Sequence, residues 1–170
     1  MTATSTSGPP SVHDAPALDA DGLLEMSPVH LDALFQNAPA GEIPVGDAVG
    51  TIVTLPGSPL AKPVARVLGA LFWRGKVFRP ATHDLKNKLS PLGIPAIRAR
   101  VYEAGSWLDG RPCVVLDYSE TSKVAGWIRD EIREVAPGLY LGLVWGFGRI
   151  FRGRRVVLRF ALTVPAAPDA

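Results

Sequence analysis

The stretch that decides the fold lies in the last third of the chain, with LYLGLVWGF at residues 139–147 and VVLRFALTV at residues 156–164. In both segments most of the large apolar residues recur at every second position, which is typical of a β-strand with one buried face. Arg152-Gly153-Arg154 between them predicts a turn. The two segments are therefore expected to pair as a long antiparallel β-hairpin.

Further strands are expected upstream of this hairpin, at residues 49–55, 77–78, 96–103 and 113–118. Asp109-Gly110 provides the turn chemistry for a second hairpin between the last two of these segments. Residues 81–91 form a polar segment and are expected to be a loop or a single turn. Together with the hairpin, these segments predict about six strands joined by short connections.

Two or three helices are expected. Ser27-Pro28 provides an N-cap and a first-turn proline for a short helix that ends at Asn37-Ala38-Pro39, and residues 58–72 carry apolar residues at helical spacing. The longest helix is expected within residues 119–135, where Val124, Trp127, Ile128, Ile132 and Val135 span one face of Lys123–Val135.

These elements predict an α+β fold, a small antiparallel β-barrel or strongly curved sheet with one main covering helix and one or two short helices. Residues 25–164 are expected to form a single domain. Residues 1–24 and 165–170 are expected to be disordered tails, because the first is rich in Ser, Thr, Pro, Ala and Asp and both have few large apolar groups.

Composition and charge exclude several classes of protein. The 170 residues are 47% hydrophobic and 20% charged, which excludes an intrinsically disordered chain and a coiled coil. Residues 1–61 hold seven acidic residues and no Lys or Arg, whereas all 18 Lys and Arg residues follow. The bases are scattered, so nucleic-acid binding is disfavoured, and the acidic segment is expected to pack beside the basic body.

The chain start carries no secretory signal pattern, no window is apolar enough for a transmembrane helix, and the single cysteine, Cys113, excludes an intramolecular disulfide. A cytoplasmic location is therefore expected. No phosphate-binding loop, nucleophile-elbow motif or histidine cluster occurs, so we expect no cofactor and no metal site.

Glu131 is the first candidate for chemistry. On the expected helix it lies in the centre of the apolar, core-facing stripe, where a carboxylate must be paired or protonated. Such a residue is suited to general acid–base catalysis. The competing interpretation is an ion pair between Glu131 and an inward Arg or Lys that only fixes the orientation of the helix.

Asp117 and Tyr118 are the next candidates, because they end a strand and alternation directs one of them inward. A capping role for the following helix is an equal alternative. Arg98, Arg100 and Tyr102 share one face of a strand. They are either a solvated face or, in a barrel with a polar interior, ligands for a carboxylate, enolate or phenolate.

The segment Trp73-Arg74-Gly75-Lys76-Val77-Phe78 forms a W-x-G-K-x-F motif and follows a glycine-containing strand that begins at Gly46. It resembles the GXWXG-motif family of small bacterial proteins of unknown function and, more loosely, lipocalin-type barrels. The resemblance covers residues 46–80 and implies a lipocalin-like β-barrel with a ligand cavity. It makes Lys76 the motif lysine, whose role is unassigned.

The hypothesis that joins these features is a cavity that binds a hydrophobic small molecule, such as a polyketide, a terpenoid or a lipid. If the protein is an enzyme, a cofactor-free cyclase or isomerase is favoured, with catalytic residues Glu131, Asp117 and Tyr118. The substrate-binding residues are then expected to be Trp73, Lys76, Arg100 and Tyr102.

The alternative is a non-catalytic lipid-binding, accessory or peripheral-membrane module. In that case residues 60–72, together with Lys62, Arg66, Arg74 and Lys76, would contact an anionic lipid surface. The sequence leaves the oligomeric state open.

Overall fold

Residues 17–54, 57–71, 73–89, 94–123, 125–148 and 152–165 are described by the computed structural model. The tails expected at residues 1–16 and 166–170 lie outside the described residues.

In the described part of the chain, eight antiparallel strands form a closed barrel in chain order, and β8 pairs back onto β1. The strands are β1 Gly46–Val53, β2 Trp73–Arg79, β3 Asp84–Leu89, β4 Ile94–Gly105, β5 Pro112–Asp117, β6 Ile128–Ala136, β7 Leu139–Gly146 and β8 Arg155–Thr163. The small antiparallel barrel expected from the sequence is therefore confirmed, as is the hairpin of β7 and β8.

Short helices accompany the barrel: α1 Ala20–Glu25, α2 Pro28–Asn37, α3 Ala61–Leu71 and the 3-10 turn η1 Pro80–Thr82. Helix α2 begins as expected, because the Ser27 side chain accepts a hydrogen bond from the backbone N–H of His30 and Pro28 occupies the first turn. The disordered tail expected over residues 1–24 is wrong at its end, because helix α1 begins at Ala20. Asp19 caps it, and Leu23 and Leu24 are buried.

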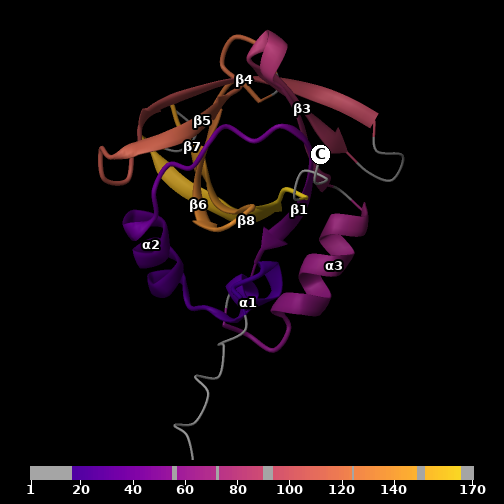
Figure 1. Cartoon of the computed structure of the whole chain (residues 1–170), viewed down its shortest axis with the longest axis vertical. Coiled ribbons are helices and arrows are strands. Elements are labelled where there is room, and N and C mark those ends of the chain that lie inside the picture. The colour runs from indigo at the N-terminus through magenta and orange to yellow at the C-terminus, as the bar shows by residue number, and fades with distance from the viewer. Residues whose placement is uncertain are drawn as a thin grey trace, which may run out of the picture.

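The helices lie together along one side of the barrel, with α3 against β1 and β2, α1 against β8 and β1, and α2 against β6 (Figure 1). Their apolar side chains and the outward-facing side chains of the strands form what we call the outer core. Its buried members are Leu23, Leu24, Leu31, Phe35, Val53, Ala61, Ala65, Cys113, Val115, Leu139, Leu141, Leu143, Trp145 and Ala161.

Alternate residues of the same strands point into the barrel and, with Tyr118 and Ala125 of the β5–β6 connection, form the inner core. Its buried members are Ala48, Phe78, Leu85, Ala99, Val101, Val114, Leu116, Tyr118, Ala125, Ile132, Tyr140, Phe160 and Leu162. Most of them fill one end of the barrel, the packed end. The segment between α2 and β1 crosses this end (Figure 1), where Ile43 packs on the inner core and the Tyr140 hydroxyl donates to the Glu42 carbonyl at 2.9 Å.

Two sequence expectations about secondary structure are wrong. The main covering helix expected within residues 119–135 is absent, because residues 128–136 form strand β6 between β5 and β7. Most of the polar segment 81–91 forms strand β3 rather than a loop. Among the described residues, no helix has the length and apolar character needed to cross a membrane.

Candidate functional site

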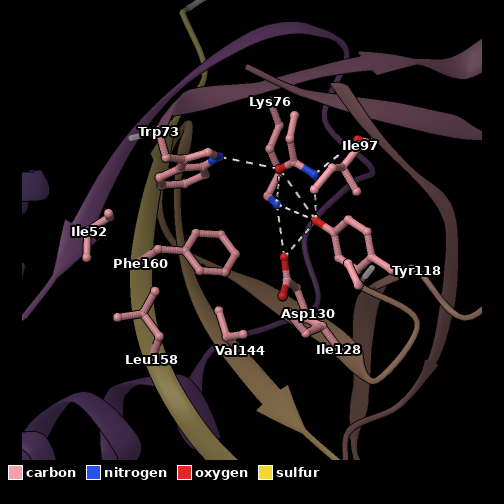
Figure 2. A pocket seen from close by; sticks show the side chains of 12 residues that line it. Ile52, Trp73, Lys76, Ile97, Tyr118, Ile128, Asp130, Val144, Leu158 and Phe160 are labelled. Carbon is pink, nitrogen blue, oxygen red and sulfur yellow. Dashed lines mark hydrogen bonds and ion pairs between the residues drawn. The ribbon is translucent and has the colours of Figure 1, made fainter. Parts of the chain in front are cut away.

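The end of the barrel opposite the packed end contains a cavity of about 210 Å³, the central cavity. Its wall comes from every strand except β5 and from the β5–β6 connection, and most of the side chains are apolar (Figure 2). They are Ile52, Trp73, Lys76, Asn87, Ile97, Tyr118, Ala125, Ile128, Asp130, Val144, Leu158 and Phe160.

Two glycines shape the aromatic part of this wall. A Cβ atom on Gly142 would lie 2.2 Å from the Phe160 ring, and one on Gly50 would lie 2.5 Å from the Trp73 ring. Because both positions lack a side chain, the two rings can lie across the strands and meet edge to face, with centroids 5.4 Å apart.

Lys76 is the centre of a buried polar cluster in the cavity wall, and its side chain is only 3% exposed. Its Nζ donates to Asn87 Oδ1 at 2.8 Å, to the Tyr118 hydroxyl at 2.7 Å and to Asp130 Oδ2 at 2.9 Å (Figure 2). It also lies 5.2–5.5 Å from the ring centroids of Trp73, Tyr118 and Phe160. Hydrogen bonds, an ion pair and aromatic faces thus replace the water that the ammonium group has lost.

The other members of the cluster are also connected by hydrogen bonds. The Tyr118 hydroxyl donates to Asp130 Oδ2 at 3.0 Å and accepts from Asn87 Nδ2 at 3.0 Å. Asn87 Nδ2 also donates to the Ile97 carbonyl at 3.2 Å, and Asn87 Oδ1 also accepts from Trp73 Nε1 at 3.3 Å. This arrangement fixes the orientation of each side chain.

Burial dominates the electrostatics of the cluster. It lowers the pKa of Lys76, although the negative charge of Asp130 and the hydrogen bond to it act in the opposite direction. Burial raises the pKa of Tyr118 well above its ordinary value, and the charge of Asp130 adds to this effect. Tyr118 therefore stays a neutral phenol that donates a hydrogen bond to Asp130.

Glu131 lies outside the central cavity. It is fully buried, as expected, but on strand β6 alternation directs it outward while Asp130 points into the barrel. Its carboxylate accepts from the Ser106 hydroxyl at 2.5 Å and from the Trp107 backbone N–H at 2.8 Å, and it forms an ion pair with Arg129 Nε at 3.1 Å. The expected apolar helical stripe does not exist, and the ion-pair alternative describes this residue.

Asp117, Arg100 and Tyr102 also lie on the outside of the barrel. Asp117 accepts from the Tyr102 hydroxyl at 3.0 Å and from the Ser119 backbone N–H at 2.8 Å, a turn contact. The helix that it was expected to cap is not formed by the described residues that follow it. Arg100 is exposed and paired with Glu120 at 2.7 Å. The idea that this face of β4 lines a polar interior is therefore wrong.

Of the residues expected to form a site, the structure brings Trp73, Lys76 and Tyr118 together in one cavity. Sequence reasoning missed Asn87 and Asp130. Asp130 carried a usable signal, because it lies between Ile128 and Ile132 at a spacing of two residues. Within the described ranges, no group of three or more His, Cys, Asp or Glu side chains is placed to hold a metal ion.

Comparisons with known proteins support the fold alone. No protein-family model matches the chain, and no curated protein matches it. The solved structure described as "Crystal structure of protein from Thermomonospora curvata" is similar, with a TM-score of 0.55 and 22% sequence identity over 83% of this chain and 89% of that chain. The class that fold and site define is a small closed β-barrel with an internal cavity.

Proposed function

We propose that the protein binds a hydrophobic small molecule, such as a polyketide, a terpenoid or a lipid, in the central cavity. The main observation behind this proposal is the apolar cavity at the end of the barrel opposite the packed end. It keeps about 210 Å³ open between apolar walls and a buried polar cluster, whereas the pocket at the packed end, beside Ile43, Phe78 and Val101, has about 140 Å³. Ligand sites in proteins commonly combine these features.

The size of the cavity limits what it encloses. An apolar cavity of about 150 Å³ holds a benzene molecule, so this cavity has room for a body of about eight to ten non-hydrogen atoms. A larger polyketide, terpenoid or lipid would place one end in the cavity and leave the rest at the mouth of the barrel.

The same cavity supports a cofactor-free conversion of the bound molecule, of the cyclase or isomerase class. In this version of the proposal Asp130 takes the place of Glu131 as the acid–base group, because it is the carboxylate in the cavity wall. The resemblance to the GXWXG-motif family and to lipocalin-type barrels supports the binding function, since Trp73 and Lys76 of the W-x-G-K-x-F motif both line the cavity.

A matched pair of variants tests the proposal. Val144→Phe places a ring inside the cavity, whereas Val157→Phe places the same ring on an exposed site of the neighbouring strand β8. Native mass spectrometry of freshly purified protein, followed by titration with 4-ethylphenol and 4-ethyltoluene, should detect a retained or added small molecule in the wild type and in Val157→Phe. Val144→Phe should lose it.

Two results would overturn the proposal. One is the absence of both a retained molecule and binding of either probe in the wild type. The other is equal binding by Val144→Phe and Val157→Phe, which would place the bound molecule outside the cavity.

The membrane alternative is favoured by Leu60 and Val67, which are more than half exposed at and near helix α3. Against it, Lys62 is paired with Glu25 at 2.8 Å, and Lys76 is buried in the cavity wall. Co-sedimentation with anionic vesicles at low and high salt tests this alternative, and no pelleting at low salt would remove it.

A further inference from the structure

One acceptor is left over in the buried cluster of the central cavity. Asp130 is 4% exposed, and its Oδ2 accepts hydrogen bonds from Lys76 and Tyr118. Among the described residues, its Oδ1 has no hydrogen-bond donor, and Figure 2 shows this second oxygen without a dashed line. Asp130 lines the central cavity, so this free acceptor oxygen is available to a molecule bound there.

The other polar atoms of the cluster have no remaining capacity. Lys76 has three N–H groups and three acceptors, and the Tyr118 hydroxyl donates once and accepts twice. Both N–H groups of the Asn87 amide are used, and its oxygen accepts twice. A ligand that enters the cavity can therefore form a strong hydrogen bond at Asp130 Oδ1 without breaking an existing one.

We infer that Asp130 Oδ1 is the recognition atom of the cavity, and that the ligand is a neutral molecule with an O–H or N–H donor at the end that enters first. An alcohol or a phenol on an apolar body meets this description. The inference rests on the proposed binding function and adds the polar chemistry of the ligand to it.

The cluster also disfavours carboxylate ligands. The Lys76 ammonium is already neutralised by Asp130 and its N–H groups point to protein acceptors, so it cannot hold a second anion. A ligand carboxylate would meet the Asp130 carboxylate in a desolvated cavity, where repulsion between like charges is strong.

Three probes of similar size test the inference on the unmodified chain. They are 4-ethylphenol, which carries a donor, 4-ethyltoluene, which has a methyl group in place of the hydroxyl, and benzoate, which carries a negative charge. Burial of apolar surface alone favours 4-ethyltoluene. We expect isothermal titration to show the reverse, with 4-ethylphenol bound at least about tenfold more tightly than either of the others, because a hydrogen bond to a charged group contributes that much.

The possible failures are distinguishable. If 4-ethyltoluene binds as tightly as 4-ethylphenol, or if benzoate binds most tightly, the inference about Asp130 is wrong while the binding function stands. If none of the three binds, the binding function fails and the inference fails with it.

A pair of variants locates the effect. Asp130→Asn replaces a carboxylate oxygen in the cavity, and Asp47→Asn makes the same change at an exposed site on β1. The preference for 4-ethylphenol over 4-ethyltoluene should fall about tenfold or more in the first variant and stay unchanged in the second. An unchanged preference in a folded Asp130→Asn protein would contradict the inference. The wild-type comparison decides it if that variant does not fold.

Discussion

Lys76 and Asp130 form an ion pair whose side chains are 3% and 6% exposed, so neither charge is solvated by bulk water. Removing one partner of a buried pair leaves an isolated charge and costs about 3–5 kcal/mol. Lys76→Met should therefore lower the free energy of unfolding by about that amount in urea titrations. Lys123→Met, at an exposed lysine, should change it by less than about 0.5 kcal/mol.

The double variant Lys76→Met/Asp130→Asn separates the charge from the loss of packing. It contains no isolated charge, so it should recover at least half of the stability that Lys76→Met loses. If the double variant is less stable than Lys76→Met, the polar contacts to Tyr118 and Asn87 matter more than the balance of the two charges.

At the scale of elements, Arg133 holds helix α2 and the β4–β5 turn against the barrel. The fully buried guanidinium donates to both carboxylate oxygens of Asp109, at 2.7 and 2.8 Å, and to the carbonyls of Phe35 at 2.9 Å, Arg111 at 2.9 Å and Pro112 at 3.0 Å. Arg133→Met should lower the free energy of unfolding by about 3–5 kcal/mol and speed amide exchange in α2.

Arg133→Lys tests whether a positive charge alone restores the stability that Arg133→Met loses. A lysine has three donors on one atom and cannot reproduce the planar fork, so it should recover less than half of the loss. Arg155→Met, at an exposed site on β8, is the control and should change stability by less than about 0.5 kcal/mol. Full recovery by Arg133→Lys would show that the geometry of the contacts is unimportant.

The burial pattern of each strand explains why some strands are predictable from the sequence and others are not. Strands β7 and β8 were predicted because each presents an apolar residue at every second position to one of the two cores. Strand β6 was mistaken for a helix because both of its faces are buried and both carry charges, Asp130 on the inside and Glu131 and Arg133 on the outside. Lys76 pairs with Asp130 and Asp109 with Arg133 from far away in the sequence, so no local pattern reveals these two ion pairs.

The candidate site was predictable to a similar extent. Trp73 and Lys76 were found through a motif, and Tyr118 through its position at a strand end. Asn87 lies in the polar segment Asp84–Leu89, where Lys86 and Lys88 alternate with it and hide the strand. Asn87 lies next to Tyr118 because β3, β4 and β5 are neighbours in the curved sheet, and their pairing joins residues far apart in the sequence.

At the scale of the molecule, the acidic N-terminal segment and the basic remainder of the chain pack together, as the charge distribution predicted. Asp32 on α2 forms a two-oxygen pair with Arg159 on β8, at 2.7–2.9 Å, and Glu25 on α1 pairs with Lys62 on α3. The first pair attaches α2 to the barrel, and the second joins α1 to α3 on the side of the barrel that the outer core covers. Helices and barrel therefore share one apolar interface and one set of ion pairs.

The inner and outer cores also share the same strands, since neighbouring residues of β5, Val115 and Leu116, belong to the outer and inner core respectively. We therefore expect one cooperative unfolding transition, with tryptophan fluorescence and far-ultraviolet circular dichroism giving coincident curves. Leu31→Ala in the outer core and Leu116→Ala in the inner core remove fully buried side chains, and each should lower the free energy of unfolding by about 2–5 kcal/mol.

Both variants should move the two curves together, because no strand can keep one core after the other is lost. Leu60→Ala, at a site that is 58% exposed, should leave the transition within about 0.5 kcal/mol of the wild type. If Leu31→Ala instead splits the unfolding into two steps, the helices separate from a barrel that stays closed. The barrel and its cavity would then be a structural unit that does not need α1 and α2.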